Sequence, residues 1–311
     1  MKTASIVKNL ILLTLFSVSL MAKAESNSDP FKAVYGKKDY GRPHATGFVR
    51  SNRLESFYSK APRKAFTDTD AAVPGHFSMK RKAGPVEDQG QCGSCWDFAL
   101  TSTLRGTWIS AGKDPGRLSF NYLLNCAKEM QGCEGGDFTA ADYFIHPKGA
   151  PAYGTDGGYS AYQGACKAEP AVASAVTYHM LGDSKTGPSF KDIAYVVGVL
   201  HRPVSVDLAV DDEWQKYSWG VYGNCSDNNG NDVNHMVVIE GYDCEKSVDA
   251  QGNCVFDQNG NLPNASGSWV IRNSWGDGWG DSGYIRMKAT NYEGKRCDAV
   301  ATDALYFDIA N

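Results

Sequence analysis

The sequence has no long block of basic residues, and beyond its first 24 residues it has no pronounced apolar run. Its 311 residues carry 31 Lys and Arg against 35 Asp and Glu, so electrostatics gives little support to a nucleic-acid partner. The apolar run at 10–21 is shorter than the roughly 20 residues that cross a bilayer. We therefore expect no nucleic-acid and no membrane partner. A hydrophobic share of 42% is enough for a folded core.

The apolar run is part of a predicted signal peptide, residues 1–24. Lys2 and Lys8 give it a positive start, and the sequence AKA at 22–24 is a small-x-small cleavage site. The alternative is a buried N-terminal helix. A signal peptide implies an exported protein, and a secreted, periplasmic or lysosomal destination would fit equally well.

Residues 25–70 contain no cysteine, are rich in Lys, Arg, Ser and Pro, and lack sustained periodicity. We interpret them as a short pro-segment; an N-terminal arm without a role is the alternative. The mature domain is then 71–311.

Within this domain the hydrophobic pattern changes from helical to strand-like. Apolar residues recur at helical spacing over 95–111, and 118–130 is a second predicted helix. Short segments rich in β-formers follow after residue 200, at 203–210, 235–242, 268–272 and 283–287. Helices followed by strands indicate an α+β protein with two lobes.

Nine cysteines are present: Cys92, Cys95, Cys126, Cys133, Cys166, Cys225, Cys244, Cys254 and Cys297. In an oxidising compartment most should pair, and an odd total leaves one over.

The stretch QGQCGSCWDFA, residues 89–99, holds two cysteines three apart, for which three chemistries compete. A redox dithiol normally follows a strand, whereas a polar loop precedes this pair. A zinc site needs paired ligand clusters of regular spacing, which are missing. In the third hypothesis Cys92 is structural and Cys95 is a nucleophile. Because Cys95 begins a predicted helix, the positive N-terminal end should favour its thiolate.

A thiolate nucleophile needs an imidazole and a group that orients it. Of six histidines, we place five in loops, near prolines or in the pro-segment, and His235 alone at the start of an apolar strand, HMVVIEGY. A satisfied structural histidine is the alternative for His235. Asn273 directly follows another predicted strand, so its carbonyl could accept from an imidazole N–H, and Trp275 could cover that bond.

Four blocks in this order resemble the papain-like, cathepsin-like cysteine proteases. They are QGQCGSCWDF (89–98), GCEGG (132–136), NHMVVIEGY (234–242) and RNSWGDGWGDSGYIRM (272–287). The resemblance implies an α+β papain-like fold, with a helical left lobe, a β-barrel-like right lobe and the active-site cleft between them.

The resemblance also implies roles for individual residues. Cys95 would be the nucleophile, His235 the general acid/base and Asn273 its orienter, with an oxyanion hole made by the Gln89 side chain and the Cys95 N–H. The residues it implies at the substrate are Gly135, Gly136, Asp137, Phe138, Asp207, Val233, Met236, Trp275, Trp279 and Thr302. It implies the disulfides Cys92–Cys133, Cys126–Cys166 and Cys225–Cys297, which leaves Cys244 and Cys254 to pair locally.

The implied activity is that of a secreted cysteine endopeptidase made as a zymogen. Its partners would be peptide or protein substrates and its own pro-segment as an intramolecular inhibitor. We expect a monomer without cofactor or metal. A non-catalytic binding protein on the same scaffold and an acyltransferase or transglutaminase-like enzyme are the alternatives.

Two residues depart from the family's usual pattern. Asp97 stands in the first turn of the predicted helix, where we expect it to act as a cap that faces away from Cys95. Asp207 stands where an apolar residue is usual, which predicts tolerance of basic or polar substrate groups; an Asp pointing to solvent or paired with a cation is the alternative.

Overall fold

The computed structural model describes residues 34–35, 43–67, 70–167, 169–182, 186–223, 225, 232–291 and 293–310. The predicted signal peptide lies outside these residues. Residues 31–311 fold as one unit.

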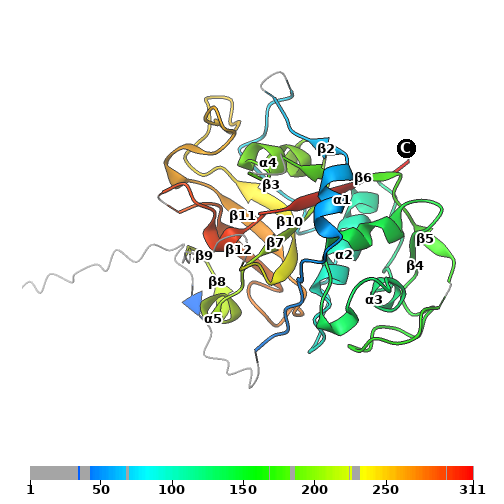
Figure 1. Cartoon of the computed structure of the whole chain (residues 1–311). Helices are drawn as coiled ribbons and strands as arrows, with labels where there is room; N and C mark the ends of the chain where they lie inside the picture. The colour runs from blue at the N-terminus through cyan, green and yellow to red at the C-terminus, as the bar shows by residue number, and fades with distance from the viewer. Residues whose placement is uncertain are drawn as a thin grey trace, which may run out of the picture. The chain divides into compact units, whose positions relative to one another are not determined.

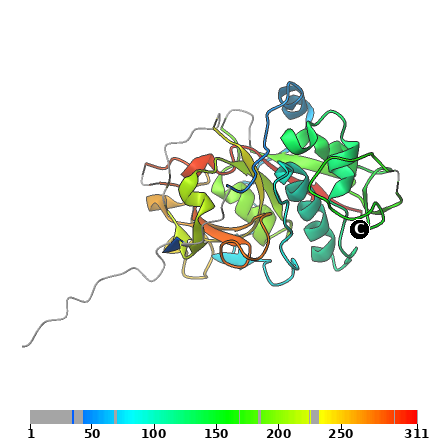
Figure 2. The ribbon, with the colours of Figure 1, turned by 90° about the horizontal axis from the view of Figure 1, so that it is seen from below.

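Short helices and a two-stranded sheet surround α2 (Cys95–Ser110) in the helical half of this unit (Figures 1 and 2). Trp96, Leu100 and Leu104 recur every fourth residue of α2, and all three are fully buried. Side chains four apart lie on one face of a helix, so this stripe anchors α2 in the lobe's core. The surrounding elements are α3 (Asn121–Cys126), η1 (Gly132–Glu134), η2 (Phe138–Phe144), β4 (Ala150–Pro151) and β5 (Ala171–Ala173).

The other half is built on a nine-stranded sheet in the order β2-β6-β13-β7-β10-β11-β12-β9, with β3 also paired to β10. Neighbours are antiparallel except β2–β6 and β12–β9. In the described residues β2 and β9 do not pair, so the barrel-like lobe is an open sheet. The strands are β2 (Arg63–Lys64), β3 (His76–Ser78), β6 (Thr177–Leu181), β7 (Val204–Leu208), β9 (Val221–Tyr222), β10 (His235–Asp243), β11 (Ser268–Arg272), β12 (Tyr284–Lys288) and β13 (Ala304–Asp308).

Short elements complete the sheet lobe. Ser189 and Asp192 form a capping box at the start of α4 (Phe190–Gly198), which packs on β10. Asp211 caps α5 (Asp212–Gln215) by accepting from the backbone N–H of Trp214. The remaining elements of this lobe are β8 (Tyr217–Trp219), η3 (Pro263–Ala265) and η4 (Cys297–Ala299).

Strand β10 divides its side chains between two hydrophobic cores. Val237 and Ile239 belong to the core of the sheet lobe, whereas Met236 and Val238 belong to the core of the helical lobe. Successive strand residues point to opposite faces, so a strand buried on both faces can join two lobes. β10 therefore forms the boundary between them, and His235 stands at its first position.

The predicted pro-segment contacts both lobes. β1 (Val34–Tyr35) pairs with β8, and β2 pairs with β6 at the end of the main sheet. Between them, α1 (Leu54–Lys60) lies on the helical lobe, with Phe57 stacked on Tyr178 at 5.0 Å (Figure 1).

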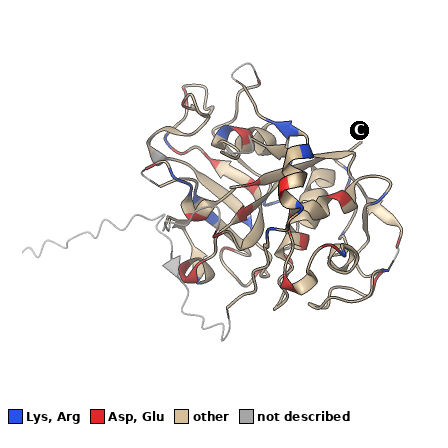
Figure 3. Ribbon diagram, viewed as in Figure 1, with Lys and Arg blue, Asp and Glu red and all other residues tan. Residues whose placement is uncertain are grey.

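The predicted helix and strands match observed elements, but the second helix is shorter than expected, since α3 covers Asn121–Cys126. The placement of His179 in a loop was wrong, because it lies in β6; His76, which is near Pro74 as stated, lies in β3. Among the described residues, no helix has both the length and the apolarity to cross a membrane. Acidic and basic residues are interspersed along the ribbon (Figure 3).

Candidate active site

Cys95 is the first residue of α2 and has a free thiol, whereas the other eight cysteines form disulfides. The four bonds join the pairs expected from the sequence: Cys92–Cys133, Cys126–Cys166, Cys225–Cys297 and Cys244–Cys254. The first of them ties the loop before Cys95 to the glycine-rich turn at 132–136. One cysteine of the 89–99 stretch is therefore structural and the other remains available for chemistry.

His235 and Asn273 meet because their strands are neighbours. His235 begins β10, Asn273 follows β11, and these strands pair in antiparallel register. His235 Nε2 lies 2.8 Å from Asn273 Oδ1. The backbone N–H of Met236, the next residue on β10, donates to Cys95 Sγ at 3.4 Å. The start of β10 thus contacts the sulfur of the helical lobe through Met236 and holds His235 beside Asn273.

Tryptophans cover the bond between His235 and Asn273. The rings of Trp275 and Trp214 lie 5.0 and 5.9 Å from the imidazole, centroid to centroid. Trp279 stacks on Trp214 at 4.8 Å, and all three indoles are at most 3% exposed. Excluding water from a hydrogen bond strengthens it electrostatically, so this cluster can fix the imidazole's orientation.

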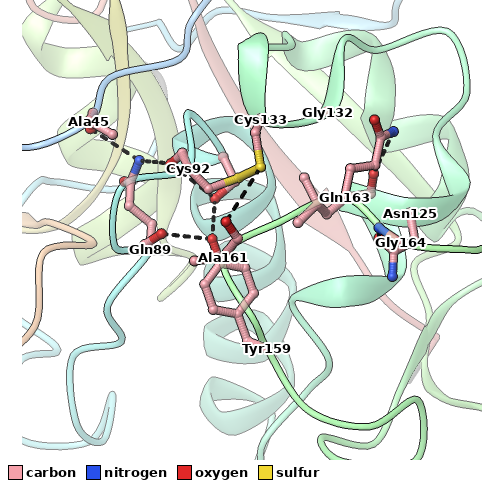
Figure 4. The surroundings of a disulfide bond; sticks show 12 residues. Ala45, Gln89, Cys92, Asn125, Gly132, Cys133, Tyr159, Ala161, Gln163 and Gly164 are labelled. Carbon is pink, nitrogen blue, oxygen red and sulfur yellow. Dashed lines mark hydrogen bonds between the residues drawn. A yellow bond between two sulfur atoms is a disulfide. The ribbon is translucent and has the colours of Figure 1, made fainter.

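Gln89 presents its side-chain amide beside the disulfide Cys92–Cys133 (Figure 4). Its Oε1 accepts from Ser274 Oγ at 2.6 Å, which turns Nε2 the other way. Nε2 donates to the carbonyl of Ala45 at 3.1 Å and to that of Cys92 at 2.9 Å. Ser274 therefore sets which face of the amide is available as a donor.

The backbone of the predicted pro-segment passes directly over this site. The N–H groups of Gly47 and Phe48 donate to Asn234 O, at 3.0 and 2.9 Å. Gly136 N donates to Gly47 O at 2.9 Å, and Val49 N donates to Gly136 O at 3.0 Å, which makes a parallel bridge. This segment leaves Cys95 and His235 with no exposed surface.

Residues 44 and 45 extend the same path past the tryptophans. His44 stacks on Trp275 with ring centroids 4.5 Å apart. The carbonyl of Ala45, already held by Gln89, also accepts from Trp275 Nε1 at 3.1 Å. Gln215 exchanges hydrogen bonds with the His44 backbone.

Glycine is required where the segment crosses the loop before α2. A Cβ on Gly47 would lie 1.9 Å from Gly93 O, and a Cβ on Gly93 would lie 2.7 Å from Thr46 O. Both neighbours are backbone atoms, which cannot rotate away. The two chains can pack this closely only because both positions lack a side chain.

Burial opposes charge separation in this covered site. It raises the pKa of the Cys95 thiol to about 12, although nearby backbone groups, led by Met236, act against the rise. Burial also lowers the pKa of His235 to about 4, against the hydrogen bond to Asn273. In this covered state burial therefore favours the neutral thiol and the neutral imidazole, whereas the thiolate expected at the helix N-terminus stays a prediction for an open site.

The expected substrate-contacting residues fall into two groups: most lie at the pro-segment or near the imidazole, whereas Thr302 makes a local contact. Asp137 Oδ2 accepts from Ser51 N at 2.8 Å, and Phe138 meets Phe48 edge to face at 5.9 Å. Thr302 instead uses its hydroxyl on the carbonyl of Ala299. Gly135, Gly136, Val233 and Met236 stand at or near the same segment. Trp275 lies at the imidazole, and Trp279 contacts Trp275.

Asp207 is fully buried, so it does not point to solvent, and the alternative of pairing with a cation is the one that agrees with the nearby guanidinium of Arg50. Its Oδ1 accepts from the backbone N–H of Asp303 at 2.8 Å. Arg50 Nη2 lies 3.0 Å from Asp303 Oδ2 and 3.8 Å from Asp207 Oδ2. Sequence reasoning missed Asp303, because only the pairing of β7 with β13 brings it to Asp207.

Other departures are local. Asp97 is buried and accepts from Thr101 Oγ1 at 2.9 Å within α2, and burial raises its pKa well above the ordinary range, so the expectation of a cap was wrong. Ser274 and Trp214 were also missed. The position of Ser274 next to Asn273 was the available signal.

Comparisons with known proteins agree with this arrangement. Residues 73–307 match the family model described as papain family cysteine protease. Vignain from Phaseolus vulgaris is 34% identical over 88% of this chain and 68% of its own length. Vignain from Vigna mungo is 33% identical over 70% of this chain, and the chain spans only 55% of that relative.

Among solved structures, the digestive procathepsin L2 proteinase from the larval midgut of Tenebrio molitor superposes with a TM-score of 0.68 and 26% identity. The match covers 86% of this chain and 78% of that one. The extent of the family match, and the identity to vignain over most of the chain, show that this chain belongs to the papain family of cysteine proteases.

Proposed function

We propose that this chain is the zymogen of an exported cysteine endopeptidase, in which Cys95, His235 and Asn273 cleave peptide bonds through an acyl-enzyme. The observation that carries the proposal is the Ala45 carbonyl, a peptide carbonyl that Gln89 Nε2 binds in a chain whose free thiol, that of Cys95, is buried.

In the proposed reaction the thiol of Cys95 transfers its proton to His235, and the sulfur attacks the substrate carbonyl. Gln89 Nε2 and the Cys95 N–H donate to the resulting oxyanion. The imidazolium then protonates the departing amine, and the acyl-enzyme remains. Neutral His235 next removes a proton from water, which attacks the thioester and releases the acid and the thiol. Asn273 keeps the ring oriented throughout.

We propose that residues 25–70 inhibit the enzyme until they are removed. The pro-segment bridges Gly136 in parallel, so an antiparallel substrate would run in the opposite direction through the cleft. The procathepsin among the similar structures supports this role. The four disulfides fit an oxidising destination, and with it the predicted export through residues 1–24.

The test is peptidase activity in reducing buffer after the pro-segment has been removed. Wild type should cleave a fluorogenic peptide and be titrated one to one by an epoxide inhibitor. Cys95→Ala should be inactive and take up no inhibitor. Asp142→Asn changes an exposed carboxyl whose partner is Tyr178, and should behave as wild type.

The alternatives predict different products. An acyltransferase or transglutaminase-like enzyme would need an added amine and leave the peptide uncut. A non-catalytic binding protein would bind peptide without turnover in either variant. Either result would overturn the proposal.

A further inference from the structure

The hydroxyl of Tyr159 joins the two segments that carry the proposed oxyanion-hole donors. Tyr159 lies in the loop between β4 and β5, and its hydroxyl donates to the carbonyl of Gln89 at 2.8 Å (Figure 4). The same phenol oxygen lies 2.7 Å from the hydroxyl of Ser94, the residue before Cys95. One phenol thus bridges the residue whose amide is one donor and the residue that precedes the other donor.

The direction of these two hydrogen bonds follows from their acceptors. A carbonyl oxygen has no proton, so the phenol proton goes to Gln89 O, and the Ser94 hydroxyl donates to the phenol oxygen. Ser94 Oγ also lies 3.5 Å from Cys92 O, which is the longer of its two contacts. Burial raises the pKa of Tyr159 above its ordinary value, against the hydrogen bond with Ser94, so the phenol keeps its proton at neutral pH.

Ser94 is the N-cap residue of α2, yet its side chain makes no capping hydrogen bond. A serine at this position ordinarily accepts from a backbone N–H in the first turn, which stabilises the helix. Here the side chain is fully buried, and its hydroxyl contacts Tyr159 and the carbonyl of Cys92 instead. The start of α2 therefore lacks a local stabilising bond and is tied to the phenol in its place.

The turn that begins at Gln89 depends on the same phenol. The Gln89 carbonyl also accepts from the backbone N–H of Cys92, but at 3.4 Å, so the bond from Tyr159 is the shorter and stronger one. On its other side, Gln89 N donates to Ser274 O of the sheet lobe at 2.8 Å. A shift of the peptide that follows Gln89 would therefore move the side-chain amide, and Tyr159 opposes that shift.

The ring of Tyr159 is itself held in place. It meets Phe98 of α2 edge to face at 4.8 Å, and Phe98 stacks on Phe120 at 4.3 Å. Both phenylalanines are at most 3% exposed. Two residues after Tyr159, Ala161 packs on the loop before α2, where a Cβ on Gly90 would lie 3.2 Å from the Ala161 Cβ. A ring anchored in this way can act as a rigid spacer between the two segments.

We propose that Tyr159 is a positioning residue of the oxyanion hole, whose hydroxyl fixes the separation of the Gln89 amide from the Cys95 N–H. This inference rests on the proposed function and concerns the same site. The phenol acts through the two backbone segments and not on the reacting atoms. Donors that are fixed in advance need no rearrangement when charge develops on the oxyanion.

The test is a double-mutant cycle in the matured enzyme, in which Tyr159→Phe is measured in the wild-type and in the Gln89→Ala background. Each variant is scaled by epoxide titration, so misfolded protein does not count. A misplacement of 1 Å can cost about 10²-fold in rate, so a smaller displacement should lower kcat by about tenfold with little change in KM. Without the Gln89 amide no pair of donors remains to be aligned, so the same substitution should then cost less than about 3-fold.

Tyr162→Phe is the matched control, because this tyrosine lies in the same loop and is 63% exposed; it should behave as wild type. If Tyr159→Phe gives no titratable enzyme, Ser94→Ala takes its place in the cycle with the same expected outcome. Equal losses in both backgrounds, a loss confined to KM, or no loss at all would overturn the inference while peptidase activity stands. If matured wild type cut no peptide, the proposed function would fail, and this inference with it.

A second arm measures the oxyanion hole without turnover. A peptide aldehyde forms a tetrahedral adduct when the Cys95 sulfur bonds to its carbonyl carbon, and the carbonyl oxygen then stands where the oxyanion would be. Its dissociation constant should rise by about tenfold in Tyr159→Phe and stay unchanged in Tyr162→Phe. A lowered kcat with an unaltered dissociation constant would show that the phenol affects a different step, and would overturn the inference.

Discussion

Removing the pro-segment should change the reactivity of Cys95 by orders of magnitude. In the covered state the pKa of its thiol is about 12, so at pH 7 roughly one thiol in 10⁵ is ionised. A thiol at an open helix N-terminus has a pKa of roughly 3.5–7.5, so at least about a quarter is ionised at pH 7. The ionised fraction should therefore rise by about 10⁴-fold or more on maturation.

Part of this gain is offset, because a thiolate of lower pKa is a weaker nucleophile. With a Brønsted coefficient of about 0.4–0.5, a drop from pKa 12 to 7 reduces the intrinsic reactivity by about 10²-fold. The expected net result is alkylation by iodoacetamide about 100-fold faster in the matured protein at pH 7. Relief of steric shielding adds to this in the same direction.

Intact mass measures this directly, because Cys95 is the one cysteine outside a disulfide. The zymogen and a sample matured by an added protease would be quenched at intervals without reductant, and each should gain a single adduct. Cys95→Ser should gain none. Equal rates at pH 7 for the zymogen and the matured protein would refute the claim that the pro-segment keeps the thiol neutral.

Four further outcomes are expected. Gly47→Val should release the pro-segment, because its Cβ would meet Gly93 O at 1.9 Å; overpacking of about 1–3 kcal/mol corresponds to roughly 5- to 150-fold faster maturation on gels, and a normal rate would contradict the close packing. Maturation should also speed up as the pH falls from about 6.5 to 4. Burial lowers the pKa of His235 to about 4 in the covered state, so between pH 6.5 and 4 this imidazole binds a proton in the open state but not in the covered state. The equilibrium therefore shifts toward the open state by up to about tenfold per pH unit. A maturation rate that is flat over this window would exclude the imidazole as the cause. Gln89→Ala should lower kcat of the matured enzyme by about 10²–10³-fold at an unchanged inhibitor titre, and a change confined to KM would show that Gln89 only binds substrate. Asn273→Ala should lower kcat and shift the acidic limb of the pH–rate profile. An unaltered profile would show that Asn273 does not influence the imidazole.

Local sequence was enough for the elements that contribute the reactive groups. The run SWVIR at 268–272 coincides with β11, and the apolar stripe of 95–111 gives α2 to within one residue. Here the periodicity of buried side chains agrees with the tertiary structure. At 118–130 the observed helix has only six residues, between Phe120 and Ala127, and the chain continues into turns.

The spacing of residues along the sequence could not show that the reactive side chains meet in the folded protein. Cys95 and His235 are 140 positions apart, and without the resemblance each was only one of several candidates. Asp303 had no local signal at all, since its importance comes from an ion pair with Arg50 and a backbone contact with Asp207. Long-range pairings of this kind are properties of strand order, which hydrophobic periodicity does not encode.

The state of the thiol illustrates the same limit. Position at a helix N-terminus predicts ionisation, and the helix is where it was expected. Burial under residues 43–49 favours the neutral thiol instead. These residues show no periodicity in the sequence, so their path over the cleft could not be predicted.

The helix α1 has a consequence for the lifetime of the matured protein. Leu54 and Phe57 are 2% and 8% exposed, and they belong to the same core as α2. A chain cut after residue 70 loses these apolar contacts, so it would have to refold with less surface to bury. The matured form therefore depends on unfolding slowly, and its durability is better measured as a half-life than as a reversible melting point.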